Sequence, residues 1–515
     1  MTANWMSGYV SDVAYTLGYY RELAPTFLHF ACTASGVASP EPEKALRYCE
    51  LGCGRGYGTL LVAAANPNST FVGIDFNPAH VAEARNLAKK AGITNVSFLE
   101  MSFGDAAKSS KPELADFDIV SLHGVYTWVM PEVKREIVDF IREKLVSGGL
   151  VYVSYNCMPG WAPVGPMQRL LKEVGDRSTR QSVAVIDEGM ELMKKLVEHS
   201  SAFVSQNPTI KNRVEKMGKQ DKAYLAHEFL NAGWQPIYVT DTMEDFSSAK
   251  ATYVGSASIA ENRPDLCVSR DLLPLVREAP DIAMHELLKD YAINKQFRRD
   301  LYIKGPQRLN PREHRQQLGA LMFAPTNMND AVPEKFQLPI GELKPKPEIM
   351  TKLMAGIGSK PLSGDDIIAA GIKADLKEPD AILYLLLLVN NGIVLPARKD
   401  HATIDRAPSH RLNQTIMEMS AASDTHRFLA SPVLGSAIGA GFVDRIFGPQ
   451  LETDPKATDA KVAGMAFDYL AKSGQSFRRD GKAIAKDDTN IAEISKIVKE
   501  FREQRLPRWK MLGVA

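Results

Sequence analysis

One glycine-rich stretch constrains the fold of this chain more than any other part: Glu50-Leu51-Gly52-Cys53-Gly54-Arg55-Gly56-Tyr57-Gly58. An apolar run leads into it and a second one, residues 59–65, follows it, which is the pattern of a strand, a tight turn and a helix. Glycines let the backbone turn tightly and approach a ligand, and the free amides at the start of a helix face an anionic group. The stretch therefore predicts a nucleotide or cofactor site.

The spacing of these glycines excludes two common nucleotide sites. A dinucleotide fingerprint needs glycine at its first, third and sixth positions. Here the sixth position is Tyr57 counted from Gly52, and Thr59 counted from Gly54. No Gly-Lys-Ser or Gly-Lys-Thr ending is present, so a triphosphate loop is excluded as well. The pattern that remains, an acid followed by alternating glycines, resembles motif I of the class I S-adenosylmethionine methyltransferases.

The segments after the glycines have the order of a doubly wound sheet. Residues 71–75 form a β-rich run that ends in Asp75, where such folds place the carboxylate that binds ribose hydroxyls. Residues 96–99, 116–123 and 150–155 have the composition of strands three to five and alternate with helical patterns. We therefore expect an α/β fold with the doubly wound, seven-stranded sheet of class I methyltransferases, an inserted helical element, and mainly helical middle and C-terminal domains.

Bulk properties narrow the class of protein. A length of 515 residues favours two to four domains, and 62 Lys and Arg against 61 Asp and Glu give a net charge of +1, which argues against nucleic acid as a partner. No apolar run approaches the ~20 residues of a membrane span, and residues 1–5 lack the order of a signal peptide. We expect a cytoplasmic protein without membrane insertion.

No metal site is predicted. The five cysteines are scattered and form no CxxC frame. His227-Glu228 begins an H-E-x-x-H pattern, but its last position is Asn231, so a zinc protease is excluded.

The expected cofactor, S-adenosylmethionine, assigns roles along the predicted sheet edge. The glycine stretch would surround the methionine and ribose, Asp75 would bind the ribose hydroxyls, and the residues after strands two and three would lie near adenine. Cys53 either touches the cofactor or fills space as a small apolar residue. The predicted cofactor site consists of Glu50, Gly52, Cys53, Gly54, Gly56, Asp75, Phe76, Ser102, Phe103 and His123.

Aromatic and amide side chains after strands four and five predict the acceptor side of the site. Residues just beyond the carboxyl ends of strands line the ligand crevice of such sheets. The predicted catalytic set is Tyr126, Trp128, Tyr155, Asn156 and Trp161, with core packing as the alternative for each. Aromatic faces would attract an ammonium group, and Asn156 would orient the acceptor nitrogen.

Tyrosines before the first strand are a further feature. By analogy with methyltransferases of this class, Tyr9, Tyr15, Tyr19 or Tyr20 would close the site as part of a lid, or would instead pack on the sheet; the sequence does not say which.

Later motifs resemble a narrower family. They are Leu122-His123-Gly124-Val125-Tyr126, Val153–Asn156 with Pro159-Gly160-Trp161, Tyr224–Glu228, Phe297–Leu301 and Leu429–Gly435. Together with motif I they are similar to bacterial methyltransferases that carry a methyltransferase regulatory domain, a family that includes the rickettsial protein lysine methyltransferases. The resemblance spans residues 10–450 and implies a catalytic domain, an inserted element for dimerisation, a middle domain and a C-terminal domain.

The expected boundaries follow from this organisation. The catalytic domain takes residues 1–165 and 223–260, with strands expected at 237–240 and 251–257, and residues 166–222 form the inserted helical dimerisation or cap element. Residues 261–346 form the middle domain, with a long helix expected around 282–299, and residues 347–515 form the C-terminal domain.

The C-terminal domain is expected to begin like a winged helix and to continue as helices. Its third helix, residues 381–390, is nearly all apolar, whereas a helix that reads DNA presents polar groups to base edges. We expect a packing or protein-interaction module.

The functional expectation is in-line methyl transfer from S-adenosylmethionine to lysine side chains of a protein, with a homodimer as the expected assembly. Two alternatives stay open because fold does not fix substrate: methylation of a small molecule or natural product on the same scaffold, and a cofactor-binding scaffold without turnover.

Overall fold

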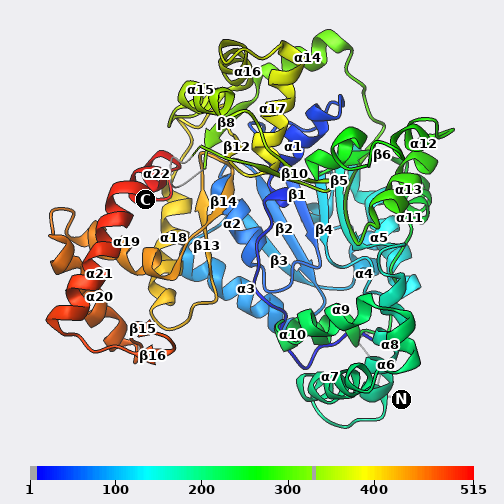
Figure 1. Ribbon diagram of the computed structural model, residues 1–515, viewed down its shortest axis with the longest axis horizontal. Coiled ribbons are helices and arrows are strands. Elements are labelled where there is room, and N and C mark those ends of the chain that lie inside the picture. Colours follow the sequence, from blue (N-terminus) through cyan, green and yellow to red (C-terminus); the bar gives the residue numbers. More distant parts are fainter. Residues whose placement is uncertain (1–7, 327–331) are drawn as a thin grey trace.

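The computed structural model describes residues 8–326 and 332–515, so the first residues used in the signal-peptide argument lie outside the described part. Its centre is a seven-stranded sheet in the order β3-β2-β1-β4-β5-β7-β6, in which only β7 runs antiparallel to its neighbours (Figure 1). The strands are β1 Arg47–Leu51, β2 Thr70–Asp75, β3 Val96–Glu100, β4 Phe117–His123, β5 Leu145–Asn156, β6 Ala251–Ser256 and β7 Phe297–Lys304. The class I methyltransferase sheet predicted from the sequence is confirmed.

Helices cover both faces of this sheet and form two separate apolar cores. One face packs against helices that include Leu28, Leu61 and Val81, and the other against helices that include Ala106, Ile137 and Phe246. The first group is α1 Pro25–Ala34, α2 Tyr57–Ala65 and α3 Pro78–Ala91, and the second is α4 Phe103–Lys108, α5 Pro131–Lys144 and α11 Val239–Ser248. Strands buried on both sides explain the nearly continuous apolar runs in the sequence.

The last two strands differ from the sequence expectation. The helix expected around 282–299 ends as α13 Ile282–Ile293, because Asn294 adopts a left-handed conformation with φ 49°, and the chain then enters β7. The expected strand at 237–240 is absent: Ile237 forms one isolated bridge with Cys157, and α11 begins two residues later. The sheet therefore takes β7 from the segment that the sequence placed in the middle domain.

A buried ion cluster lies where α13 meets β7. The Arg298 guanidinium contacts carboxylates of Glu286 at 2.7 Å, Asp290 at 2.6 Å and Asp300 at 2.8 Å. Lys289 adds an ion pair to Glu286 at 2.6 Å. All five side chains are at most 5% exposed, so their charges depend on one another.

The inserted element is a helical layer with its own apolar core below the sheet in Figure 1. Its helices are α6 Gly165–Asp176, α7 Ser182–Glu198, α8 Ala202–Gln206, α9 Thr209–Met217 and α10 Lys222–Phe229. The N-terminal strap, residues 8–20, runs along it: Gly8 O accepts from Ala232 N, Val10 N donates to Asn231 Oδ1, and Val13 O bonds His227 Nε2.

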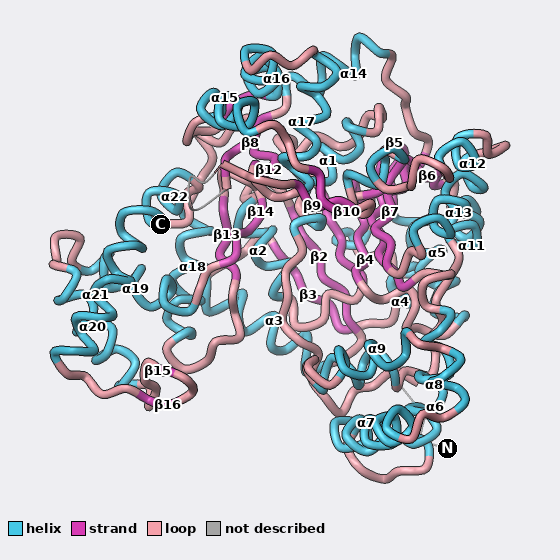
Figure 2. The backbone as a smooth tube through the Cα atoms, in the orientation of Figure 1, coloured by secondary structure: helices cyan, strands magenta, loops and turns pink. Residues whose placement is uncertain are grey.

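The rest of the chain is mostly helical. Apart from its first helix, Leu273–Arg277, which packs on α13, it lies on the α1 and α2 side of the catalytic sheet (Figure 2). Its helices are α12 Leu273–Arg277, α14 Pro311–Ala320, α15 Pro347–Ile357, α16 Gly364–Lys373, α17 Glu378–Asn390, α18 Ala407–Ser420, α19 Phe442–Thr453, α20 Asp459–Lys472, α21 Asp488–Glu500 and α22 Leu506–Met511. Its short strands are β8 Met322–Pro325, β9 Phe336–Leu338, β10 Gly341–Leu343, β11 Leu362–Ser363, β12 Val394–Ala397, β13 Phe428–Ser431, β14 Ser436–Gly439, β15 Arg478–Arg479 and β16 Lys482–Ala483.

Helices α15 to α17 followed by β12 have the order expected for the winged-helix-like start. Residues Leu385–Val389 of α17 are buried, so this apolar helix packs in the core. Within residues 8–326 and 332–515, no helix has both the length and the apolar character that crossing a bilayer requires.

Candidate active site

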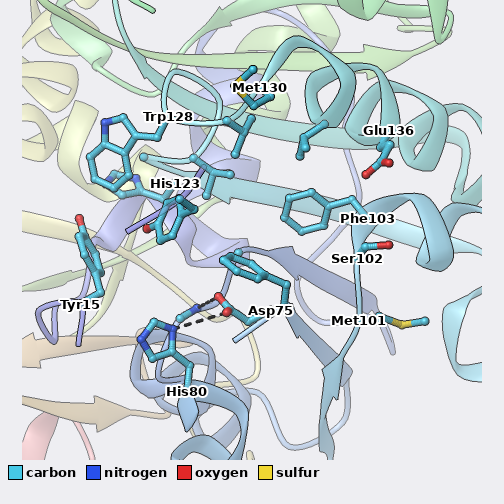
Figure 3. A pocket seen from close by; sticks show the side chains of 18 residues that line it. Tyr15, Asp75, His80, Met101, Ser102, Phe103, His123, Trp128, Met130 and Glu136 are labelled. Atoms are coloured by element: carbon cyan, nitrogen blue, oxygen red, sulfur yellow. Dashed lines mark hydrogen bonds and ion pairs between the residues drawn. The ribbon is translucent and has the colours of Figure 1, made fainter. Parts of the chain in front are cut away.

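A pocket lies beyond the carboxyl ends of β1, β2, β3 and β4, the edge at which doubly wound sheets bind ligands. Figure 3 shows Tyr15, His123 and Trp128 gathered at one end of it, and Met101, Ser102, Phe103 and Glu136 at the other. Its lining residues are Tyr9, Tyr15, Gly52, Gly54, Asp75, Phe76, His80, Met101, Ser102, Phe103, His123, Gly124, Val125, Trp128, Val129, Met130, Val133 and Glu136.

The glycine turn shapes one wall of the pocket. Gly52, Gly54 and Gly56 have φ values of 70°, 53° and 71°, a conformation that side chains other than glycine rarely adopt. A Cβ on Gly54 would meet no atom within 4 Å, so this backbone is open to a ligand. A Cβ on Gly56 would lie 2.5 Å from Ala84 Cβ and 2.7 Å from the Phe98 ring, so Gly56 serves close packing of α2 on the sheet.

Two other predicted cofactor residues in this stretch lie outside the pocket lining. The Glu50 carboxyl group is 8% exposed and accepts a 2.5 Å hydrogen bond from Thr59 Oγ1, and burial raises its pKa to about 7. The Cys53 sulfur faces β2, where a Cβ on Gly73 would lie 2.9 Å from it. Direct cofactor contact by either residue stays a prediction.

Asp75 is the acidic group at the centre of the pocket. Its Oδ2 accepts from Gly54 N and its Oδ1 from Asn77 N, each at 2.9 Å, which fixes the carboxylate while leaving lone pairs for ribose hydroxyls. His80 lies beside it, with Nδ1 3.5 Å from Asp75 Oδ1 (Figure 3). The His80 ring is buried, and neither ring nitrogen has a hydrogen-bond partner in the described structure. His80 was not predicted from the sequence; its signal is its place in the helix directly after Asp75.

The other end of the pocket suits a flat, mainly apolar group. Phe76, Met101 and Phe103 line it. Ser102 caps α4 by accepting from Asp105 N at 3.0 Å, and Glu136 Oε2 accepts from Gly104 N at 3.1 Å. Glu136 was also missed, because it comes from α5, which sequence patterns link to the sheet but not to a particular pocket.

The structure shows where the tyrosines of the strap lie relative to the pocket: Tyr9 and Tyr15 line it. The Tyr9 ring lies between Phe76 and His227, with both centroid distances 5.5 Å, and Tyr15 contacts Trp128 at 5.7 Å. Tyr20 stacks on His123 with a centroid distance of 3.7 Å. The neighbouring Tyr19 points away and bonds Ser436 Oγ at 2.6 Å in the C-terminal domain.

Trp128 and Asn156 meet a residue that was not predicted, Glu228. Asn156 Nδ2 donates to Glu228 Oε1 at 2.5 Å and Tyr224 OH donates to Oε2 at 3.1 Å, while the Trp128 indole faces the same carboxyl group. Glu228 is 2% exposed, and burial raises its pKa to about 7. We call Tyr15, Trp128, Asn156, Tyr224 and Glu228 the acceptor cluster.

The other three predicted catalytic residues lie elsewhere. Tyr126 OH donates to Asp245 Oδ2 at 2.7 Å within the core under α11, and Tyr155 OH donates to Asp300 Oδ2 at 2.6 Å in the ion cluster. Tyr155 faces the side of the sheet opposite Asn156 because neighbouring strand residues alternate. Trp161 packs on Phe229 and Trp234 in the core of the inserted element.

The pocket fits S-adenosylmethionine. A carboxylate held for ribose, an apolar end for adenine and an open glycine backbone for the amino-acid part are all present. No group of three or more potential ligands placed for a metal ion occurs among the described residues.

Replacing Asp75 by Ala should weaken S-adenosylmethionine binding by about 1–3 kcal/mol, because charged hydrogen bonds to the ribose are lost. Asp75→Asn, which keeps an acceptor for Gly54 N, should lose less. Isothermal titration measures both, with Asp187→Ala on α7 as the control. Equal affinity of Asp75→Ala and the wild-type chain would contradict the assignment of Asp75 to the ribose.

Comparison with known proteins agrees with this geometry. A model of a methyltransferase domain matches residues 42–239, and a model of a predicted methyltransferase regulatory domain matches residues 221–304, the segment that supplies β6 and β7. The chain is 32% identical to the uncharacterized protein sll1526 of Synechocystis sp., over 99% of this chain and 100% of that protein. It is 26% identical to the protein RP789 of Rickettsia prowazekii, over 58% of this chain and 53% of that one.

Among solved structures, that of PKMT2 from Rickettsia typhi in complex with AdoHcy matches with a TM-score of 0.70 at 18% identity, covering 97% of this chain and 99% of that one. The chain thus belongs to one family with the Synechocystis protein, and that family is the class I S-adenosylmethionine-dependent methyltransferases that carry a methyltransferase regulatory domain.

Proposed function

We propose that this methyltransferase acts on the ε-amine of lysine side chains in a protein. The observation that carries the proposal is Glu228, a buried carboxyl group beside the end of the pocket where Tyr15 and Trp128 lie. A buried acid is costly unless it has a partner, and an ammonium group is the partner that its charge favours.

The aromatic members of the acceptor cluster add to this preference. The rings of Tyr15 and Trp128 lie 5.7 Å apart, and both side chains interact with the Glu228 carboxyl group. Such π faces attract a cation, and their low polarity lowers the pKa of an amine below the ~10.4 of free lysine. A lysine that enters as an ammonium group can then lose its proton.

The polar members divide the remaining roles. Asn156 Nδ2 is committed to Glu228, so its side-chain carbonyl is left to accept a hydrogen bond from the acceptor nitrogen. Glu228, with a pKa raised to about 7 by burial, is suited to hold the proton that leaves the amine. S-Adenosylmethionine, when bound, supplies a methyl group activated by its sulfonium charge.

Labelling with S-adenosylmethionine that carries a radioactive methyl group tests the proposal. The purified chain is incubated with an extract of its own cells, proteins are separated from small molecules, and labelled proteins are digested for mass spectrometry. We expect label on peptides as N-methyl-lysine. Label confined to the small-molecule fraction would favour the small-molecule alternative, and cofactor binding without any transfer would favour a scaffold.

A further inference from the structure

Two arginines beside the acceptor cluster have no carboxylate partner. Arg213 lies on α9 of the inserted element, and Arg299 lies on β7. Arg213 Nη1 contacts Gln296 Oε1 at 3.5 Å, and Arg299 Nη1 contacts Ser258 Oγ at 3.4 Å. Arg299 Nε is buried and has no hydrogen-bond partner in the described part of the chain, where neither arginine forms an ion pair.

The residue before Arg299 on the same strand is paired very differently. Arg298, the residue before Arg299, contacts three carboxylates on the opposite face of the same strand. Just after the strap, Glu22 is already paired with Arg21, at 3.8 Å. Arg298 therefore has carboxylate partners, whereas Arg299 keeps N–H groups that can donate hydrogen bonds to a ligand.

The register of the sheet places Arg299 beside the site. His123 pairs with Ser154, and Ser154 pairs with Arg299, so these three residues form one row across β4, β5 and β7. At ~4.8 Å per strand, the Arg299 backbone is about 10 Å from that of His123, which lines the pocket. Asn156 of the acceptor cluster pairs with Phe297 two residues further along, on the same face of the sheet. The Arg299 guanidinium lies 5.0 Å from the Phe297 ring.

Arg213 reaches the same place from the inserted element. Its guanidinium lies 4.7 Å from the centre of the Trp161 ring. The same guanidinium contacts Gln296, the residue just before β7. Burial is the largest influence on Tyr224 and Glu228 and raises the pKa of both. The positive charge of Arg213 acts in the opposite direction and lowers both pKa values. Tyr20 lies beside the acceptor cluster, where it is 39% exposed and stacks on His123.

We propose that Arg213 and Arg299 bind carboxylates of the acceptor, so that the preferred acceptor is a lysine flanked by Asp or Glu in a peptide segment. The inference rests on the proposed lysine acceptor and adds its sequence context. A guanidinium fork matches a carboxylate with two parallel hydrogen bonds, and a half-buried guanidinium without a partner gains most from one. Glu228 would then hold the amine while the arginines hold the neighbouring acid.

Short synthetic peptides with one lysine test this, with Asp or Glu, Ala, or Arg on both sides of the lysine. For the wild-type chain we expect kcat/KM for the acidic peptide to exceed that for the Ala peptide by about 10- to 100-fold, the value of one or two charged hydrogen bonds. Arg299→Glu and Arg213→Glu should each reduce this ratio and improve the Arg-flanked peptide relative to wild type. Arg312→Glu on α14, which reverses an exposed charge, is the matched control.

The outcomes separate the two proposals. Titration with S-adenosylmethionine shows that each variant is folded, and Arg299→Gln replaces Arg299→Glu if the charge reversal prevents folding. Methylation of all lysine peptides at the same rate, in wild type and variants alike, would overturn the arginine assignment and leave the lysine acceptor intact. Methylation of no lysine peptide and no protein lysine would overturn the proposed function itself.

Discussion

Replacing Arg298 by Met should lower the free energy of unfolding by about 3–5 kcal/mol, because it leaves a buried cluster of acids without their main cation. Arg298 is 2% exposed, and its three carboxylate partners come from α13 and from β7 itself. Met fills similar volume, so the loss reflects charge and not a cavity. The exposed pair Arg135–Glu132 offers the control, and Arg135→Met should cost about 0.5 kcal/mol.

The loss should also depend on pH. In the wild-type chain the cations hold the pKa of Glu286 at about 2 against the desolvation that would raise it, so this group contributes stability above its unfolded pKa, and that stability is lost as pH falls toward 2. Burial already raises the pKa of Asp290, to about 7, and the pKa of Asp300. Without Arg298 these pKa values rise further and that of Glu286 rises too, so the folded variant takes up protons that the unfolded chain releases. The difference between variant and wild type should therefore be larger at pH 8 than at pH 5.

Urea unfolding at both pH values measures the free energy of unfolding of Arg298→Met and wild type. Hydrogen exchange of the β5 and β7 amides then measures the loss of stability around residue 298. If the β5 and β7 amides of Arg298→Met were as well protected from exchange at pH 8 as those of wild type, the buried acids would not need Arg298.

Glu228→Gln should lower kcat by about 10²–10³ while leaving S-adenosylmethionine affinity unchanged, because the carboxyl group that holds the amine and its proton is replaced by an amide of the same shape. Asn156 and Tyr224 would lose a charged partner but keep a polar one. Glu191→Gln on α7, an exposed position, is the control. Turnover equal to wild type would remove Glu228 from the mechanism.

The pH profile separates a chemical role from a structural one. Burial raises the Glu228 pKa to about 7, and the active form is the carboxylate, so the wild-type rate should rise as pH increases through about 7. This step should be missing in Glu228→Gln, whose amide does not titrate. A variant that is merely misfolded would instead keep the step at reduced amplitude.

Much of the cofactor side was accessible from the sequence because its signals are local. Alternating glycines after an apolar run specify a tight turn, and the strand that ends in Asp75 follows at the distance of one helix. The structure brings Gly52, Gly54, Asp75 and Phe103 to one pocket. Each of these positions is set by backbone geometry within a few residues.

The acceptor side shows where local signals fail. Asn156 and Tyr155 are neighbours in the sequence, yet strand alternation sends one toward Glu228 and the other into the ion cluster. The helix expected around 282–299 extended into the start of β7, where Arg298 and Arg299 give no apolar strand pattern, and charged residues are rarely buried without partners. The partners of Arg298 lie on α13 and on β7 itself, and no local pattern connects α13 with this strand.

The sequence by itself determined the first five strands of the sheet, the glycine turn, the family and the cofactor, because turn chemistry and hydrophobic periodicity act over short stretches of chain. Only the tertiary structure decided that Tyr9 and Tyr15 line the pocket while Tyr20 stacks on His123, and that Glu228 meets Asn156. It also decided that Arg213 and Arg299 have no carboxylate partner among the described residues. These contacts join residues up to about 200 positions apart, and burial and pairing of charge across such separations depend on how the layers pack.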